Sequence, residues 1–505
     1  MATAKSRWQK LTAKRSAVLE RAREASKLTI PGLIPEEGAS DNTHYDTPYQ
    51  SLGARGVNNL SSRLLLSLLP PETSFFNLRI DEDVAAALGD SQADAQEQMA
   101  RIERKANTRV EGSNARPVLA EVLRHLAVAG NGLLYFPRSV NLQFFRLDQY
   151  VIRRAPDGSP REIVVKEQVY PDTLSPKVRQ AVNLSDKDKE SEKKRVDVYT
   201  WIRWVNGRVK YHQEINDKRV PDSNGSHPEA TTPWIPLRWT ALPNEDYGRS
   251  LVMEYNGDLL SLEELSKAIV KFASATSKII FMERPGSTTD IDSLNKAESG
   301  DWVAGDPDDV AVFQIEKFAD FRVASETADK LELRLSHAFL LRSGTIRDAE
   351  RVTAEEIRAT AQELEDVLGG VYTVLSREFQ LPFVRRLLKI MQDDRSIPRL
   401  PNDAVSPIIV TGFEALGRNH STNRLRAMMI DAREILGDQL VASYVNVAEV
   451  LKRLGTGHGV EGLDDLLKSE DQVASENETA ALQTAASAAA PGVALEATKA
   501  AVQSQ

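Results

Sequence analysis

Two amphipathic segments of similar length, separated by a stretch of mixed composition, constrain the fold of this chain more than any other feature. Apolar side chains in both segments recur every three or four residues, the spacing of one buried helix face. They are Leu262, Leu265, Ile269, Phe272 and Thr276 in the first segment, and Ala328, Leu331, Leu335 and Ala338 in the second. The pattern predicts an antiparallel helix pair that carries a small α/β excursion, Lys278 to Ala324, at one end.

Capping sequences predict where the two helices begin. Ser261-Leu262-Glu263-Glu264 has the form of a capping box, and Ser325 stands at the start of the second helix. Helices of about 17 residues would each be roughly 25 Å long. Within the excursion we expect three short strands: Lys278–Met282, Trp302–Ala304 and Val310–Gln314.

A polar segment, Ser343 to Arg351, follows the pair and precedes a second capping box at Thr353-Ala354-Glu355-Glu356. A long helix should follow, bent at Gly369-Gly370 and kinked at Pro382, because glycine weakens a helix and proline interrupts its hydrogen bonds. Beyond it we expect one strand, two further helices and an Ala-rich end without regular order: Ile408–Thr411, Leu425–Leu436, Leu440–Leu454 and the residues from about Ser475.

The part of the chain before the pair changes period. Helical patterns, ended by proline and glycine, come first: residues 5–28, 52–69, 91–110 and 117–129, the last with Gly130 as its C-cap. A period of two then predicts strands at Leu133–Phe136, Gln143–Arg146, Ile163–Gln168, Val196–Val205, Arg208–Ile215 and Trp234–Trp239. Asn206-Gly207 suits a type I′ hairpin turn between two of them. The fold class is therefore α+β and mainly helical.

Composition narrows the class of function. The chain has 505 residues, no cysteine and a formal net charge of −9. Disulfides and thiolate metal sites are excluded, and the acidity argues against a protein that grips DNA tightly, since such proteins neutralise many phosphates with Lys and Arg. No stretch approaches the roughly 20 apolar residues that span a bilayer, and no apolar core follows the first cations as in a signal peptide.

Sequence motifs of catalysis are missing. The dipeptide Gly-Lys of a phosphate-binding loop does not occur, nor does His-Glu-x-x-His or Gly-x-Ser-x-Gly. Two carboxylate clusters, Asp290/Asp292 and Asp306/Asp308/Asp309, do not follow an EF-hand pattern. We therefore expect no enzymatic activity, no metal site and no cofactor.

Five segments resemble, in order and with similar spacing, the portal (head-to-tail connector) proteins of T7-like short-tailed bacteriophages. They are Tyr45 to Leu60, Val128 to Tyr135, Tyr247 to Lys271, Arg351 to Tyr372 and Gly412 to Arg418. The likeness covers roughly Leu28 to Arg424. None of these strings encodes a chemistry alone, and it is their collinearity that carries the resemblance.

The resemblance implies a portal fold with a wing, a two-helix stem, a small α/β clip and a helical crown. Mapped onto this sequence, these are the wing at 1–248, the first stem helix at 249–277, the clip at 278–324, the second stem helix at 325–342, a tunnel loop at 343–351, a long kinked helix that returns to the wing at 352–424, crown helices at 425–475 and the Ala-rich tail at 476–505.

The resemblance also implies a function. Twelve subunits would form a ring at one capsid vertex of the virion, and double-stranded DNA would be packaged and ejected through this ring. The ring would assemble in the host bacterial cytoplasm and would not bind a membrane. The ring would dock the terminase large subunit and then the tail adaptor protein, and contact the major capsid, scaffolding and internal core proteins. Two alternatives remain: a virion adaptor or scaffold without a DNA channel, and a nuclease-like enzyme, which would need converging carboxylates.

The same resemblance assigns candidate site residues. Arg347 and Arg351 are the cations of the tunnel loop, expected to contact DNA and to close as a valve together with Ser343, Gly344 and Thr345. Alternatively, Arg351 pairs with Glu355 one helical turn away. Weaker tunnel candidates are Lys267, Lys271 and Lys278, although Glu263 and Glu264 can pair with Lys267. Candidates for docking at the clip are Glu283, Arg284, Asp290, Asp292, Asp306 and Asp308.

Overall fold

The computed structural model divides the chain into two units, Met1–Gly412 and Phe413–Gln505. It describes residues 3–40, 42–70, 74–81, 84, 92–182, 184, 195–276, 280–286, 289–313, 318–341, 368–400, 405–409, 418–437, 445, 450–451 and 454. In the second unit the main described element is α15 (Arg418–Leu436), which confirms the helix predicted at 425–436 and starts seven residues earlier. The search of the described helices for one long and apolar enough to cross a membrane found none.

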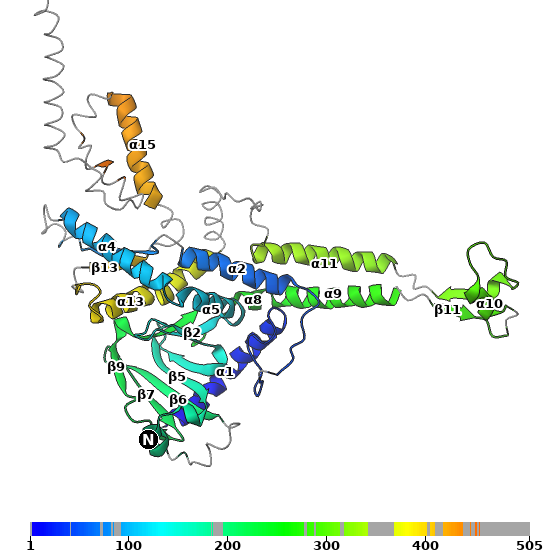
Figure 1. The fold of residues 1–505 in the computed structure, drawn as a ribbon, viewed down its shortest axis with the longest axis horizontal. Coiled ribbons are helices and arrows are strands. Elements are labelled where there is room, and N and C mark those ends of the chain that lie inside the picture. The colour runs from blue at the N-terminus through cyan, green and yellow to red at the C-terminus, as the bar shows by residue number, and fades with distance from the viewer. Residues whose placement is uncertain are drawn as a thin grey trace, which may run out of the picture. The chain divides into compact units, whose positions relative to one another are not determined.

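Helices and strands of the first unit alternate largely as the sequence predicts (Figure 1). The longer helices are α1 (Ala4–Lys27), α2 (Leu52–Leu68), α4 (Gln92–Glu111), α5 (Ala115–Ala129), α9 (Asn256–Thr276), α11 (Phe318–Ala338) and α13 (Leu381–Asp393). Short helices are α6 (Pro176–Ala181), α8 (Leu251–Glu254) and α10 (Ile291–Lys296). Gly130 ends α5 in the left-handed conformation, φ 73°, as expected of a C-cap glycine.

The largest sheet has the strand order β4-β5-β6-β7-β8, with β9 also paired to β7. Its strands are β4 (Tyr150–Arg154), β5 (Pro160–Val169), β6 (Val196–Val205), β7 (Arg208–Ile215), β8 (Lys218–Arg219) and β9 (Gly225–Pro228). A second sheet has the order β10-β2-β3, formed by β2 (Asn131–Tyr135), β3 (Gln143–Phe145) and β10 (Trp234–Arg238). The turn between β6 and β7 confirms the predicted hairpin, because Asn206 and Gly207 both have positive φ.

Four strands were not predicted: β1 (Phe76–Ile80), β4, β8 and β9. β1 pairs antiparallel with β13 (Val405–Ile409), which lies at the predicted strand 408–411 but begins and ends earlier. This two-stranded sheet joins residues more than 300 positions apart in the sequence. Pro407 is tolerated in β13 because, among the described residues, the strand has a partner on one side only.

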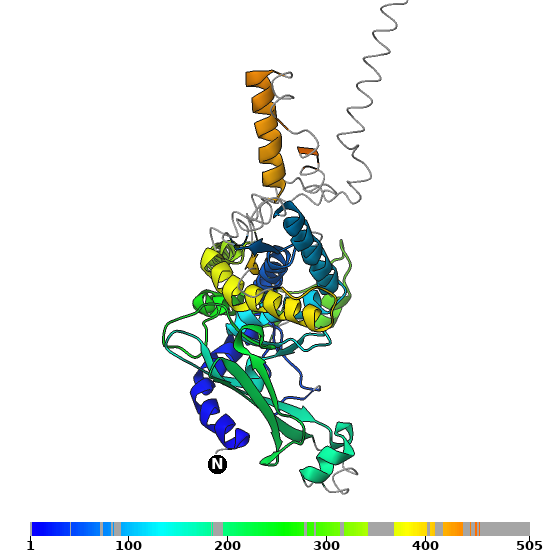
Figure 2. The same ribbon diagram turned by 90° about the vertical axis from the view of Figure 1, so that its left-hand side faces the viewer.

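Two large hydrophobic clusters organise the first unit. One lies among α2, α4, α5, α9, α11 and α13, and its fully buried members include Leu60, Leu123 and Phe383. The other lies between α1 and the sheets and includes Leu19 and Ile163. Figures 1 and 2 show α1 running along the large sheet.

Buried polar contacts fix α1 on that sheet. Arg7 binds Glu162 of β5 through two hydrogen bonds of 2.7 and 2.6 Å. One guanidinium nitrogen of Arg15 donates to the carbonyl oxygens of Leu147 and Tyr150 at 2.9 and 2.6 Å. Each contact satisfies groups that would be costly to leave unpaired away from water.

A π-helical turn lies just before Pro382, where a kink was predicted, whereas the bend predicted at Gly369-Gly370 borders residues 342–367, which lie outside the described part of the chain, and stays a prediction. Residues 368–375 are α-helical, and a π-helical turn, Ser376–Gln380, precedes α13. Pro382 lacks an N–H and its ring would collide with the carbonyl of Glu378 in a regular helix, so a wider turn relieves the conflict.

Two of the five strings that carry the resemblance, Val128 to Tyr135 and Tyr247 to Lys271, meet in space. The amide nitrogen of Asn131 donates to the carbonyl oxygen of Gly248 at 2.9 Å, and the N–H of Gly248 donates back to the amide oxygen at 2.7 Å. A Cβ at Gly130 would lie 2.7 Å from the backbone of Arg249. Glycine at this position therefore permits the close approach of two chain segments.

A buried ion pair connects the π turn to the three-stranded sheet. Arg238 of β10 binds Glu378, with one hydrogen bond of 3.0 Å from its Nε and a shorter one from its Nη2. Arg154 lies nearby, and its burial lowers the pKa of its guanidinium to about 10, opposed by the attraction of Glu378. These charges hold the start of α13 against the three-stranded sheet. We call residues 3–254 and 368–409 of the first unit the body.

Candidate functional site

Helices α9 and α11 lie side by side and antiparallel (Figure 1). Near one end Arg334 pairs with Asp258 at 3.3 Å, and near the other the rings of Phe272 and Phe321 stack at 5.1 Å. The predicted pair is therefore confirmed, but each helix has 21 residues and begins earlier than expected. Ser261 and Ser325 lie inside the helices and are not their caps.

The carboxylate of Glu263 shows why the capping prediction at Ser261 is wrong. Its two oxygens accept hydrogen bonds of 3.0 and 3.1 Å from the N–H groups of Tyr49 and Gln50, ahead of α2. The side chain thus caps a different segment of the chain. Upstream, the N–H of Leu259 already donates to the carbonyl of Tyr255, which extends α9 toward its N-terminus.

The end of α11 is held by α2. The side-chain amide of Asn59 donates to the carbonyl oxygens of Phe339 and Leu340 at 3.2 and 3.1 Å. A Cβ at Gly56 would lie 2.5 Å from the ring of Phe339, so only glycine leaves room for that ring. Leu340 adopts the left-handed conformation, φ 55°, and is buried. Sequence reasoning did not single out Asn59, Gly56 or Phe339.

This anchored turn comes immediately before residues 342–367, which lie outside the described part of the chain. The predicted tunnel-loop residues fall there: Ser343, Gly344, Thr345, Arg347 and Arg351. The alternative pairing of Arg351 with Glu355 falls there too, and Lys278 also lies outside the described residues. The assignments of these residues stay predictions.

The two remaining stem candidates are on α9. Lys267 is half-buried and Lys271 is exposed. The pairing of Lys267 with Glu263 is not seen, because Glu263 binds the backbone at residues 49 and 50.

A hollow of about 340 Å³ lies beside the anchored turn at the end of α11. It is lined by Arg55, Asp329, Glu332, Leu333, Ser336 and Leu341.

The excursion contains two antiparallel strands, β11 (Ile280–Glu283) and β12 (Val310–Phe313), at two of the three places where short strands were predicted. The predicted strand Trp302–Ala304 is wrong: these residues form no ladder, and α10 occupies part of the intervening chain. Trp302 is fully exposed, an unusual state for so large an apolar side chain.

The acidic side chains of the excursion have different tasks. Asp290 caps α10 and accepts a 2.6 Å hydrogen bond from Ser293, which lowers the pKa of its carboxyl. Asp306 accepts from the N–H of Asp308 at 3.0 Å, and buried Asp309 accepts from Thr289. All six docking candidates are exposed: Glu283, Arg284, Asp290, Asp292, Asp306 and Asp308. Within the described residues, no group of three or more acids and histidines is arranged to hold a metal ion.

Comparison with known proteins gives this architecture a family. The family described as "Bacteriophage head to tail connecting protein" matches residues 1–462. The chain is 39% identical to the portal protein of Escherichia phage T7, over 98% of this chain and 94% of that protein. It is 40% identical to the portal protein of Enterobacteria phage T3, over 97% and 92%. Among solved structures, a chain from the virion of a native gene transfer agent particle matches with a TM-score of 0.38 at 12% identity, covering 87% of this chain and 93% of that one.

These findings define the class first: a bacteriophage structural protein that connects head and tail. The chain belongs to the head-to-tail connecting protein family, the portal proteins of T7-like short-tailed phages. The resemblance inferred from five collinear strings is thereby confirmed.

Proposed function

We propose that the chain forms a ring of about twelve subunits at one vertex of the capsid, and that double-stranded DNA passes through the ring during packaging and ejection. In this arrangement α9 and α11 form the stem, the excursion forms the clip and residues 343–351 form the tunnel loop. The observation that carries the proposal is the turn at Phe339 and Leu340, which α2 fixes directly before that loop.

A loop that touches moving DNA needs rigid support at its base. Asn59 satisfies two carbonyls at the end of α11, and the left-handed Leu340 closes the turn with a 2.8 Å hydrogen bond from the N–H of Leu341 to Ser336. The direction in which the chain leaves α11 is therefore set by the body. Arg347 and Arg351 would then project from a fixed frame.

Weak and numerous contacts suit a sliding duplex. Attraction to phosphates is independent of base sequence, so a ring of cations centres DNA without holding one site. A chain with a net charge of −9 can concentrate a few cations at the loop while the remaining channel surface repels DNA.

The exposed acids and Trp302 of the excursion support a docking role for the clip. Charged rims steer partners, and a large apolar side chain provides a contact that is buried on binding. The partners proposed for this surface are the terminase large subunit and then the tail adaptor. Scaffolding, major capsid and internal core proteins would contact other surfaces.

The first test is the mass and shape of the purified full-length protein, by native mass spectrometry and negative-stain electron microscopy. We expect rings of about twelve subunits with a central channel. A compact small oligomer without a channel would contradict the proposal and favour an adaptor without a DNA channel.

A second test addresses the loop. With a photo-crosslinking residue at position 351, rings mixed with linear duplex should crosslink to DNA, whereas the same residue at position 334, which is on α11 and paired with Asp258, should not. Equal crosslinking at the two positions would remove the special role of the loop.

A further inference from the structure

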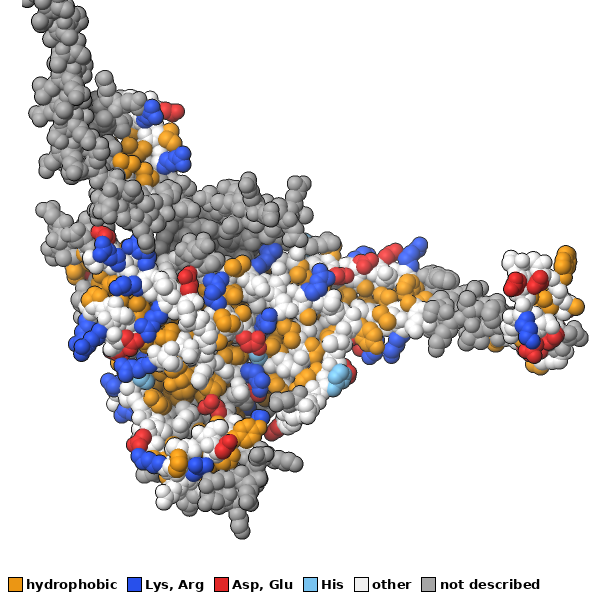
Figure 3. Space-filling model, in the orientation of Figure 1, with side chains coloured by type: hydrophobic (Ala, Val, Ile, Leu, Met, Phe, Trp, Pro, Cys, Tyr) orange, Lys and Arg blue, Asp and Glu red, His pale blue; other side chains and the backbone are white. Residues whose placement is uncertain are grey.

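One surface of the body gathers cations that have no acidic partner. Figure 3 shows Lys and Arg side chains concentrated over α4 and the end of α13. On α4 and in the turn after α13, four cations form no ion pair within the described part of the chain: Arg104, Lys105, Arg395 and Arg399. We call these four residues the basic surface.

The fold brings these cations together from α4 and from the turn that follows α13. On α4 the exposed stripe Arg101, Arg104 and Lys105 has the spacing of one helix face. One turn further along, Arg109 binds Asp394 at the end of α13, with a distance of 2.7 Å. The two elements therefore meet at this ion pair.

Two acids beside these cations, Asp393 and Asp394, are already paired. Asp393 accepts from Lys389 at 2.6 Å and lies 3.3 Å from Arg138, and the hydrogen bond from Lys389 lowers the pKa of its carboxyl. Asp394 is paired with Arg109. Their charges are balanced by cations outside the basic surface, so that surface keeps its positive charge.

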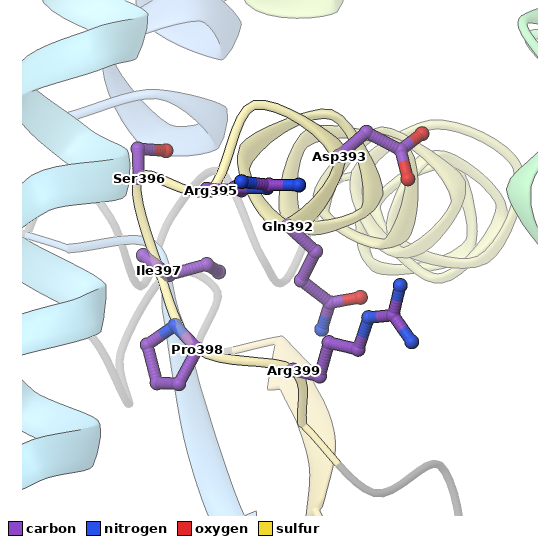
Figure 4. Close-up of a pocket in the computed structure, with 7 residues that line it drawn as sticks. All are labelled: Gln392, Asp393, Arg395, Ser396, Ile397, Pro398 and Arg399. Carbon is purple, nitrogen blue, oxygen red and sulfur yellow. The ribbon is translucent and has the colours of Figure 1, made fainter.

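A hollow of about 520 Å³ lies at the end of α13, lined by Gln392, Asp393, Arg395, Ser396, Ile397, Pro398 and Arg399. Figure 4 shows the side chains of Arg395 and Arg399 reaching into the same space from two sides of the turn. The hollow thus presents two guanidinium groups to solvent.

Arg395 occupies a position where glycine is normal. It has φ 56° and forms the left-handed residue of the turn that ends α13, in which the N–H of Ser396 donates to Met391 at 2.9 Å. Most side chains are strained there, and such strain is often retained for function. An arginine in this place therefore points to a role for its charge beyond ending the helix.

The surface lacks the features of a protein interface. None of the exposed large hydrophobic side chains of the described residues belongs to the described part of α4 or to residues 381–400. Protein interfaces depend on buried aromatic and apolar anchors, whereas phosphate backbones are bound by separated cations. Spread positive charge without apolar anchors fits a polyanion.

We propose that the basic surface binds the phosphate backbone of duplex DNA outside the channel, as a second DNA contact distinct from the tunnel loop. Its ligand is DNA that is not being threaded, and its binding is sequence-independent and sensitive to salt. The proposal does not require the channel, because the surface is complete within one subunit.

The test uses covalently closed circular duplex DNA, which cannot thread a closed ring. Binding to the full-length protein is measured by fluorescence anisotropy or filter retention at several salt concentrations, and ring formation is scored separately by mass. The triple variant Arg104→Gln/Lys105→Gln/Arg399→Gln should make the dependence of log affinity on log salt shallower. We expect the magnitude of the negative slope to fall by roughly 2–3, since each lost phosphate contact removes about 0.9.

The control carries the same change of charge elsewhere: Lys210→Gln/Lys218→Gln/Arg219→Gln, at exposed positions of the large sheet. It should leave the slope unchanged. Absence of binding to circular DNA, or equal losses in the two triple variants, would overturn the proposal. A protein that forms no ring but binds circular DNA through these residues would contradict the channel and leave this inference standing.

A single variant separates binding from folding. Arg395→Gly relieves the left-handed backbone and should keep or raise the melting temperature while lowering the salt slope by roughly 1. A purely structural role for Arg395 predicts no change in DNA binding. Polyglutamate of matched charge density is the second probe. Tighter binding of DNA than of polyglutamate supports the assignment to DNA, and tighter binding of polyglutamate would overturn it.

Discussion

The body and the α9–α11 pair are built from helices of similar length that are held in different ways. In α5 of the body nine of 15 residues are buried, so the helix is fixed by the core on most of its circumference. Among the described side chains of α9 only Leu259 and Leu262 are buried, while Leu265, Ile269 and Phe272 are half-buried. Since stabilisation follows the apolar area removed from water, the pair depends on one thin seam.

The ion pairs of the two regions differ in the same direction. The side chains of Arg238 and Glu378 in the body are 6% and 15% exposed, whereas those of Arg334 and Asp258 in the pair are 62% and 27% exposed. The body is thus fixed by its own contacts. The pair leaves apolar and charged surface open, which is what a subunit needs on the sides that meet its neighbours in the proposed ring.

The largest effect should come from breaking the buried ion pair. Arg238→Met leaves the Glu378 carboxylate without its partner and should lower the free energy of unfolding by about 3–5 kcal/mol. The matched change in the helix pair, Arg334→Met, should cost less than about 1 kcal/mol because water screens that contact. Urea unfolding of the unassembled chain measures both. Similar losses in the two variants would break the contrast between the regions.

A smaller effect on the free energy of unfolding is expected from replacing one glycine in each of the two regions by alanine. Gly56→Ala places a methyl group against the ring of Phe339 and should cost about 1–3 kcal/mol. Gly257→Ala in α9 meets no atom within 4 Å and should stabilise the chain by about 0.4–1 kcal/mol. Thermal melting of the two variants gives the comparison. If Gly56→Ala is neutral, α2 does not hold the end of α11 as tightly as the geometry indicates.

Local signals in the sequence predicted much of this fold. Asn206-Gly207 located the hairpin and Gly130 the end of α5, because each has a backbone requirement that few residues meet. The strand β1 escaped prediction, since its partner β13 is more than 300 residues away. The starts of α9 and α11 were placed too late for a related reason: the stacking of Phe272 on Phe321 and the distant use of Glu263 are tertiary effects.

The candidate site shows the same division. The helix pair and the strands β11 and β12 follow from local sequence patterns, but the pairing of these strands and the support of the turn at Leu340 do not. A signal existed in Gly53 and Gly56, two glycines within an apolar-periodic helix, which often mark close packing. Only the fold reveals that Gly56 meets Phe339, and that Asn59 binds the carbonyls beside it.

The smallest effect on the single chain, near zero, is expected at apolar residues that the helix pair leaves in water. Val270 and Val323 are 49% and 61% exposed and, from the pairing of Phe272 with Phe321, lie at the same level of the pair. Val270→Asp/Val323→Asp should leave the melting temperature of the unassembled chain unchanged but reduce ring formation, because neighbouring subunits would have to bury two charges. Val205→Asp, at a 39% exposed position of the large sheet, is the matched control and should assemble normally. Normal rings from the double variant, seen by native mass spectrometry, would show that these valines face water or the channel and that the open side of the pair serves another contact.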